Sequence, residues 1–269
     1  MPMRDRRRHR TALASCLLAA FLICGCNAAG SPSGKAVLRD IPRKDRIALM
    51  VLNFRNVSLK DKAAAYEPWE FGIPSMIISD LESIGVFNIL SWHTLKDVLE
   101  QQAFQSLGVV DEKGAVEIGK IAAARYLLTG SFMVMNGTLR IESKLFSVED
   151  GTLLGASSAS GHIDRFFELQ KRLVLEMTSS LGTALTPDEE TRLAGNVETK
   201  SVDASLDNYA GEMALIQADR LKGKGKSDAA RKLIQEAKAR FQGAVEHDPG
   251  YQRAKMNLSS LTMAIPKTL

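Results

Sequence analysis

Three cysteines carry the most distinctive chemistry in this sequence, and all of them lie near its start. Cys16, Cys24 and Cys26 fall within the first 26 of 269 residues. A thiol can form a disulfide, bind a metal or act as a nucleophile, but a disulfide or a metal site needs further ligands in the folded body. No cysteine follows residue 26. We therefore expect no disulfide framework, thiolate metal site or cysteine nucleophile in the body of the protein.

The setting of these cysteines predicts acylation instead. An arginine-rich segment, residues 4–10, precedes an apolar run over residues 11–23. Thirteen helical residues span about 20 Å, short of the roughly 30 Å core of a bilayer, so the run is typical of a signal peptide. It ends in Ile23-Cys24-Gly25-Cys26, which resembles a bacterial lipobox. We predict cleavage before Cys26 and lipidation of its thiol, for example with palmitate.

The N-terminal segment also has other interpretations. Cys24 fits the lipobox less well than Cys26, because Ile23 would occupy a position that favours a small residue. The segment is also compatible with an ordinary secretory signal, whereas a twin-arginine signal lacks its usual flanking residues. A diacyl or triacyl cysteine holds a protein firmly to a membrane. In lipoproteins of this type, an aspartate directly after the lipidated cysteine commonly retains the protein at the inner membrane. This chain has Asn27 at that position, so the resemblance predicts an anchor in the outer membrane, on its periplasmic face.

The charges disfavour nucleic acid as a partner. Residues 1–25 hold five arginines and a single acid, Asp5, which leaves 30 basic and 30 acidic residues in the rest of the chain. Binding to nucleic acid needs a clustered basic surface. The composition, 45% hydrophobic and 25% charged, is typical of a globular protein. We predict a neutral folded body without a nucleic-acid partner.

Motifs for enzymatic chemistry are incomplete. The segment 114–120 nearly spells a phosphate-binding loop, but Ile121 replaces the Ser/Thr that would hold magnesium, and the segment lies within a predicted helix. The Gly223-Lys-Gly-Lys-Ser227 loop lacks the upstream glycine of that motif. Ser157 lacks the glycine two residues later that a nucleophile elbow needs. We predict no catalytic residue and no cofactor.

The histidines and carboxylates also have structural interpretations. His93, His162 and His247 lack metal-ligand spacing, and His247 lies at a predicted helix C-terminus, where a positive charge is favourable. The run Asp188-Glu189-Glu190 is typical of a solvated helix start. We predict no metal site, which leaves Cys26 as the single functional residue.

Hydrophobic periodicity predicts an α/β fold with a mixed sheet in the order β-α-β-α-α-β-β-β-α. Residues 47–54 are almost continuously apolar, as in a strand buried on both faces. One apolar stripe from Ile73 to Ile84 predicts a helix with Pro74 in its first turn. The other predicted elements are strands 87–92, 125–135, 139–148 and 152–160, and helices 95–102, 112–124 (capped by Asp111) and 166–181, the last ending at Gly182.

Turn signals and aromatic residues complete this prediction. Asn136-Gly137 and Asp150-Gly151 are signals for tight hairpins. The broken alternation over 145–148 suggests a bulge or burial on both faces. The loop 55–70 concentrates aromatic residues beside the first predicted helix: it contains Tyr66, Pro68 and Trp69, and Phe71 lies just beyond it. For Trp69 and Phe71 we favour a role in covering the sheet over a role as partner anchors.

Several segments resemble CsgG-type proteins. Residues 115–131 match a passage in which a Gly-Lys helix runs into a strand carrying Thr-Gly-Ser, and residues 139–154 and 95–102 continue the match. The resemblance covers roughly residues 45–185. It implies kinship with the curli secretion channel subunit, the outer-membrane activators of penicillin-binding proteins and TolB-like N-terminal domains.

The departures from this family argue against a pore. The curli channel subunit carries a membrane-crossing hairpin where this sequence has the tight Asn136-Gly137 turn, and a second where only residues 161–165 are available. A membrane-spanning strand needs about 9–11 residues. The resemblance therefore implies a periplasmic scaffold or regulator that contacts envelope proteins. The alternative is a subunit of a CsgG-like secretion channel for extracellular fibres.

The remaining sequence predicts a helical tail that is similar to a tetratricopeptide (TPR) repeat. Ala237, Phe241, Ala244 and Pro249 match the small-large-small-proline pattern of a second repeat helix and its exit. Only about one and a half repeats are present, where a solenoid needs about three. We thus divide the chain into a signal peptide (1–25), a tether (26–44), a CsgG-like domain (45–187) and a TPR-like segment (200–265). The sequence leaves open whether copies of the chain form a homo-oligomer.

Overall fold

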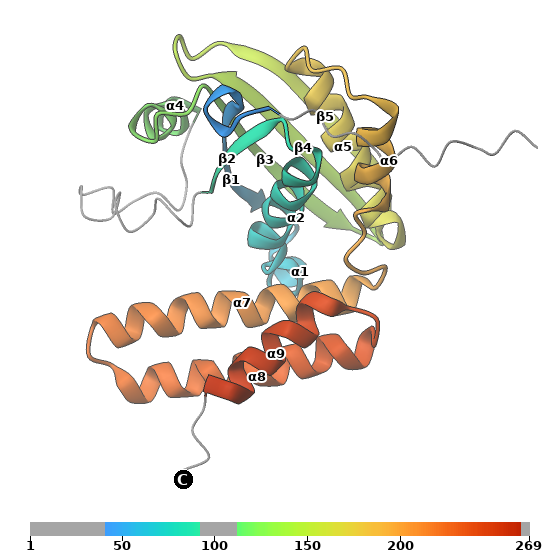
Figure 1. Cartoon of the computed structure of the whole chain (residues 1–269). Coiled ribbons are helices and arrows are strands. Elements are labelled where there is room, and N and C mark those ends of the chain that lie inside the picture. Colours follow the sequence, from blue (N-terminus) through green and yellow to red (C-terminus); the bar gives the residue numbers. More distant parts are fainter. Residues whose placement is uncertain (1–40, 92–111, 265–269) are drawn as a thin grey trace, which may run out of the picture. The chain divides into compact units, whose positions relative to one another are not determined.

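The computed structural model describes residues 41–91 and 112–264 (Figure 1). Several residues named from the sequence lie outside these ranges: Cys16, Cys24, Cys26, His93, most of the tether, the predicted helix 95–102, and Asp111, the predicted cap of helix 112–124. The elements are, in order, η1 (Arg43–Asp45), β1 (Ile47–Asn56), α1 (Lys60–Tyr66), α2 (Trp69–Ile84), β2 (Phe87–Ser91), α4 (Glu112–Ile121), β3 (Tyr126–Met135), β4 (Thr138–Ser147), β5 (Leu153–His162), η2 (Ile163–Arg165), α5 (Phe166–Ser180), α6 (Pro187–Gly195), α7 (Val202–Gly223), α8 (Ser227–His247) and α9 (Gln252–Ala264).

Five strands form one mixed sheet in the order β2-β1-β3-β4-β5. The strands β2, β1 and β3 run parallel, and β3, β4 and β5 pair antiparallel. Helix α2 makes the crossover from β1 to β2, as parallel neighbours require. The α/β class and the mixed sheet predicted from the sequence are confirmed.

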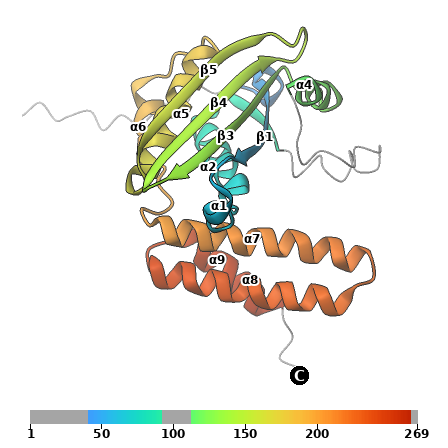
Figure 2. The ribbon, with the colours of Figure 1, turned by 180° about the vertical axis from the view of Figure 1, so that it is seen from behind.

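The sheet buries apolar side chains on both of its faces. Leu49 and Val51 of β1 belong to the larger core, which includes α2 and α5, whereas Met50 and Leu52 belong to a smaller core beneath α4. Figures 1 and 2 show α2 and α5 on the same face of the sheet. The continuous apolar run of β1 therefore reflects burial on both faces, as predicted.

Helix α2 begins earlier than predicted. It starts at Trp69, so Pro74 lies in its second turn rather than its first. Proline has no amide hydrogen to donate to the carbonyl four residues before it, yet the helix continues through this position. Gly85, in the left-handed region at φ 77°, ends the helix. The preceding loop, predicted to be irregular, contains the short helix α1.

Both predicted hairpins are present, but only the first is tight. Asn136 and Gly137 have φ values of 50° and 74°, as a two-residue turn between β3 and β4 requires. The connection from β4 to β5 is longer, and there only Gly151 has positive φ. The pairing of β4 with β5 shifts register at Leu145/Phe146, and these two side chains enter opposite cores, in agreement with the predicted bulge or burial on both faces.

Two further helix ends have clear causes. Helix α4 stops at Ile121, three residues short of the prediction, because Ala123 adopts the left-handed region at φ 52°. Helix α5 ends before Gly182, whose φ of 67° confirms that glycine as the stop. Both helices, α4 and α5, therefore end close to a residue in the left-handed region.

Helices α7 and α8 form an antiparallel hairpin, and α9 packs against α8 (Figure 2). Alanines allow close approach of these helices, and Phe241 fills the space between them. A Cβ atom added to Gly211 of α7 would lie 2.6 Å from the Phe241 ring, so this glycine is required for the packing. The helical tail is observed, and its similarity to a TPR repeat stays an interpretation.

Candidate functional site

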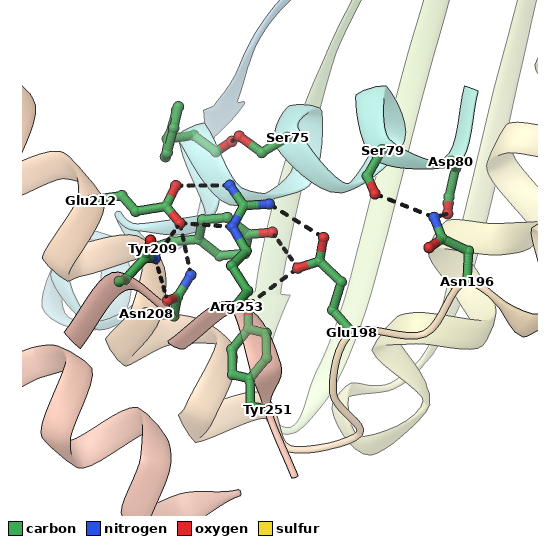
Figure 3. Close-up of polar contacts among 12 residues, drawn as sticks. Ser75, Ser79, Asp80, Asn196, Glu198, Asn208, Tyr209, Glu212, Tyr251 and Arg253 are labelled. Atoms are coloured by element: carbon green, nitrogen blue, oxygen red, sulfur yellow. Dashed lines mark hydrogen bonds and ion pairs between the residues drawn. The ribbon is translucent and has the colours of Figure 1, made fainter. Parts of the chain in front are cut away.

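Buried and half-buried polar and charged side chains gather around residues 196–201, the linker that joins α6 to α7 (Figure 3). They form two groups, one on each side of the linker. The Asp80 cluster consists of Asp80, Gln170, Lys171 and Asn196, and the Arg253 cluster consists of Glu198, Tyr209, Glu212, Tyr251 and Arg253.

The Asp80 cluster connects three elements through one carboxylate. The Asp80 side chain, on α2, is only 2% exposed. One carboxylate oxygen accepts hydrogen bonds from Lys171 Nζ and from Asn196 Nδ2, the latter at 2.8 Å, and the other accepts from Gln170 Nε2 at 2.7 Å. Lys171 also donates to the Asn196 carbonyl oxygen at 2.6 Å. Helices α2 and α5 therefore share one ion pair that also holds the start of the linker.

Burial dominates the electrostatics of this carboxylate. Desolvation raises the pKa of Asp80 above its ordinary value, although the charge of Lys171 and three hydrogen bonds act in the opposite direction. A buried carboxylate is costly unless its charge is paired and its lone pairs are satisfied. Here Lys171 supplies the countercharge, and Gln170 and Asn196 supply two more donors. The cluster is thus stable only as a complete set.

The Arg253 cluster places one guanidinium between two carboxylates (Figure 3). Arg253 Nε and Nη2 donate to the two carboxylate oxygens of Glu212 at 2.7 and 2.9 Å, a bidentate pair. Its Nη1 donates to Glu198 Oε1 at 3.2 Å. Two tyrosines, Tyr209 and Tyr251, donate to the other oxygen of Glu198 at 3.4 and 3.3 Å. The linker residue Glu198 is therefore held by both α7 and α9.

Both tyrosines of this cluster are strongly biased toward the protonated form. Burial raises the pKa of Tyr209 and of Tyr251 well above the ordinary value, and the negative charge of Glu198 adds to the effect. Burial opposes the charge of Arg253, but Tyr209, Glu212 and Glu198 raise the pKa of its guanidinium. The cluster holds a fixed cation and two phenol donors over the whole physiological range.

The charged groups of both clusters hold the helices and the linker in position. A small pocket between α2, α5 and the linker is lined by members of both clusters, together with Met76, Ser79, Phe167 and Val197. The carboxylates of Asp80 and Glu198, which line it, accept hydrogen bonds from cations and from amide or phenol donors of the same protein. In this arrangement, the charged groups fix the direction in which the chain enters α7.

Trp69 connects α2 directly to α7. Its side chain is fully buried, stacks on Phe166 at 4.2 Å between ring centroids, and donates from Nε1 to Ser205 Oγ at 3.2 Å. Tyr209 of α7 also packs on α2, where its ring lies edge to face with that of Phe71 at 5.9 Å between ring centroids. Trp69 also lies edge to face with Phe132 of β3, at 6.2 Å between ring centroids, so it covers the sheet as favoured from the sequence.

The described histidines, Gly119 and Ser157, which the sequence offered as possible site residues, make local contacts within the fold. His162 Nδ1 accepts a hydrogen bond from the Asp164 amide at the start of η2, and His247, at the C-terminus of α8, pairs with Asp207 at 3.6 Å. Gly119 lies within α4 and lets that helix approach Val148. Ser157 lies in the middle of edge strand β5, away from any strand-to-helix turn.

The acidic run at the start of α6 behaves differently from the prediction. It does begin a helix, but Glu189 is buried rather than solvated. The Glu189 carboxylate accepts from the Thr186 amide at 2.8 Å, and the Thr186 hydroxyl accepts from the Glu189 amide at 3.3 Å. This capping box satisfies two amides at the helix start. The threonine three residues before a glutamate was the signal for it.

The two clusters were not predicted from the sequence, although one of them left a signal. Asp80 lies on the apolar stripe of α2, one turn after Met76 and one turn before Ile84. A charged residue on a buried helix face indicates a buried partner, because an unpaired charge there would be too costly. Arg253 and Glu198 follow no such pattern, since their contact joins segments more than fifty residues apart.

Within residues 41–91 and 112–264, no three side chains of His, Cys, Asp or Glu come together in a metal-binding group. None of the helices in those same ranges combines the length and the apolar character that crossing a membrane requires.

Comparisons with known proteins give distant structural likenesses. No protein-family model matches the chain, and no curated protein matches it either. The chain is similar to the C-terminal domain of LpoB from Salmonella enterica (19% identity, 43% of this chain, 84% of that one, TM-score 0.34). It is also similar to lipoprotein GNA1162 from Neisseria meningitidis (14%, 51%, 98%, 0.36) and to PelC of a dodecamer from Paraburkholderia phytofirmans (14%, 54%, 91%, 0.34). With TM-scores this low, these likenesses carry no argument about the chain.

Proposed function

We propose that this protein is a lipid-anchored periplasmic scaffold or regulator that acts through protein contacts in the bacterial cell envelope. The observation that carries the proposal is the lipobox-like Ile23-Cys24-Gly25-Cys26 at the end of a short apolar run. A cysteine bearing two or three acyl chains is held firmly at a membrane surface. The folded body then faces the periplasm, where neighbouring envelope proteins are its partners.

The geometry of the folded body supports a role in binding rather than catalysis. Asp80 and Lys171 bind each other, and Arg253 binds Glu198 and Glu212, so the charged groups beside the pocket are engaged in holding helices together. General acid–base catalysis needs a titrating group within reach of a substrate. The proposal assigns no catalytic step to either cluster.

The connections of the sheet support a scaffold over a channel subunit. The β3–β4 connection is the Asn136-Gly137 turn, and the β5–α5 connection is the short helix η2. These are the two places at which the resemblance to the curli channel subunit would put membrane-crossing hairpins. Light scattering of the detergent-extracted protein tests the alternative, because a channel requires a large ring. A ring would overturn the scaffold proposal.

The anchor is tested by the substitution Cys26→Ala. Metabolic labelling with a palmitate analogue should mark the wild-type protein and the control variant Cys24→Ala, and it should leave Cys26→Ala unlabelled. The Cys26→Ala protein should also lose its membrane association, because we assign the anchor to the lipid. Labelling that survives Cys26→Ala, or disappears with Cys24→Ala, would mean that the wrong cysteine has been assigned.

The partners are tested by chemical cross-linking with mass spectrometry in intact envelopes. We expect cross-links from the folded body to other envelope proteins in cells that carry the lipidated protein. In cells with Cys26→Ala those cross-links should be lost. If cross-links form only between copies of this chain, the scaffold proposal is wrong in its choice of partner.

A further inference from the structure

The connection between α7 and α8 concentrates the positive charge of the protein. The basic tip, residues 220–232, carries six basic residues and one acid. After residue 25 the whole chain has 30 basic and 30 acidic residues, so the part outside the tip has 24 basic and 29 acidic ones. The folded body is neutral only because one short segment balances a net negative remainder. Charge in this protein is segregated rather than evenly mixed.

The basic tip is exposed and projects from the end of the helical hairpin (Figure 2). Every residue from Lys222 to Ala229 is exposed. At 1.5 Å per residue, Gly223 lies about 21 Å along α7 from Tyr209, where that helix packs on α2. The tip therefore lies well away from the two buried clusters. It is accessible to a large flat partner without any change in the packing of α7.

Some cations of the tip have local roles, and others have none among the described contacts. Lys222 pairs with Asp219 at 3.5 Å and lies in the last turn of α7, where a cation complements the helix dipole. Arg231 pairs with Asp228 at 3.7 Å. Three further lysines are exposed, and the described part of the chain offers them no carboxylate within ion-pair distance. These are Lys224, Lys226 and Lys232.

We propose that the basic tip binds anionic phospholipid headgroups at the surface of the membrane. The tip contains no Phe, Tyr, Trp or His, so it offers no platform for stacking the bases of a single-stranded nucleic acid. Lys224 and Lys226 lie in the connection between the two helices, and Lys222 and Lys232 lie in the adjoining turns of α7 and α8. They are separate point charges, whereas bidentate recognition of a single phosphate favours arginine. Exposed, independent cations of this kind fit a diffuse negative surface, which attracts each nearby lysine.

This inference rests on the proposed function only for its setting, because a lipid on Cys26 would keep the tip close to a membrane. The two ideas are separable, since the tip should bind lipid even in protein that begins at residue 27 and has no acyl chain. That chain contains every described residue. Loss of acylation would therefore leave binding by the tip unchanged, and loss of tip binding would leave acylation at Cys26 unchanged.

The test is sedimentation of the chain from residue 27 with vesicles of phosphatidylcholine, with and without phosphatidylglycerol. We expect binding only to the anionic vesicles, and binding that weakens as salt is added. The tip variant Lys224→Gln/Lys226→Gln/Lys232→Gln should bind roughly 100-fold more weakly, because each lysine near such a surface contributes about a factor of five.

A matched control removes the same charge from elsewhere. The variant Lys60→Gln/Lys200→Gln/Lys255→Gln changes three exposed lysines outside the tip and should bind as the wild type does. Equal loss in both variants would indicate attraction through net charge alone and would overturn the proposal. So would binding of the wild type to neutral vesicles, or stronger binding to isolated peptidoglycan or RNA than to anionic vesicles. Circular dichroism melting confirms that each variant is folded.

Discussion

The two buried clusters hold the same linker, but they stabilise their charges in different ways. In the Asp80 cluster, a carboxylate that is 2% exposed is paired with a single cation, and Lys171 itself is 15% exposed. In the Arg253 cluster, one guanidinium that is 29% exposed is shared by two carboxylates and lies over the Tyr209 ring. The first cluster has one ion pair around an almost fully buried carboxylate, and the second is a network of two carboxylates and several donors that is more exposed to solvent.

This difference indicates which cluster is the more fragile. Removing Asp80, whose side chain is 2% exposed, leaves the charge of Lys171 uncompensated in a largely buried site. In a network with several donors and acceptors, the remaining groups can rearrange toward the solvent. The integrity of the sheet and its helices therefore depends on Asp80, whereas the direction of the helical tail depends on several groups together.

The largest expected effect is that of Asp80→Ala. It should lower the free energy of unfolding by about 3–5 kcal/mol, because Lys171, Gln170 and Asn196 lose their common acceptor. Urea unfolding followed by circular dichroism measures the change. The control Asp164→Ala removes a carboxylate that is 79% exposed and should change stability by less than about 0.5 kcal/mol. Equal losses in the two variants would contradict the comparison.

A double substitution separates the charge from the cavity. In Asp80→Ala/Lys171→Met no unpaired cation remains, so part of the lost stability should return. If the double variant is less stable than Asp80→Ala, the cost comes from lost packing around α2 and α5 rather than from the ion pair.

Removal of the tail is the second test. A chain that ends at Lys200 keeps Asn196 and the Asp80 cluster but loses α7, α8 and α9. We expect cooperative unfolding to persist at a lower melting temperature, with a loss of about 1.5–3 kcal/mol for exposing the surface that Tyr209 covers. Calorimetry measures both quantities. Non-cooperative melting would mean that residues 45–187 and 200–265 form one cooperative unit.

A single substitution tests the same contact without truncation. A Cβ atom at Gly72 would lie 2.5 Å from the Tyr209 ring, so Gly72→Ala must displace that ring. It should weaken the attachment of α7 and lower the melting temperature of the full chain. In the truncated chain the same substitution should have little effect, because Tyr209 is absent.

The substitution Arg253→Ala should have a smaller effect than Asp80→Ala. It removes three hydrogen bonds, but Glu198 and Glu212 are 19% and 15% exposed and keep other donors. We expect a loss of about 2 kcal/mol, typical of leaving partly buried charged acceptors with fewer partners. Arg253→Lys should recover only part of it, because lysine cannot form the bidentate pair with Glu212. Urea unfolding of both variants measures these values.

The sequence predicted what depends on short-range patterns. The apolar run of β1, the stripe of α2 and the Asn136-Gly137 turn each act within a few residues, and each led to the correct element. The end of α4 was missed because Ala123 adopts a positive φ that alanine rarely takes. The Arg253 cluster was missed because its partners meet only after the tail has folded back on the linker. The assignment of Cys26 stays a prediction, since that residue lies outside the described ranges.

The smallest expected effect is a difference in the pH windows of the two clusters. Burial raises the pKa of Asp80 in the folded state, so the folded state holds a proton there that the unfolded chain has already released. That contribution to stability is present below the ordinary pKa of aspartate and is lost as pH rises through the raised pKa. Tyr209 and Tyr251 have raised pKa values too, so their contribution is lost only as pH rises above the ordinary tyrosine pKa of about 10.

Chemical unfolding measured across pH should therefore show two separate declines in the free energy of unfolding as pH rises, one in the acidic range and one in the alkaline range. Asp80→Asn should remove the acidic one and keep the alkaline one, and Tyr251→Phe should reduce the alkaline decline alone. If Asp80→Asn left the acidic decline unchanged, Asp80 would not be its source.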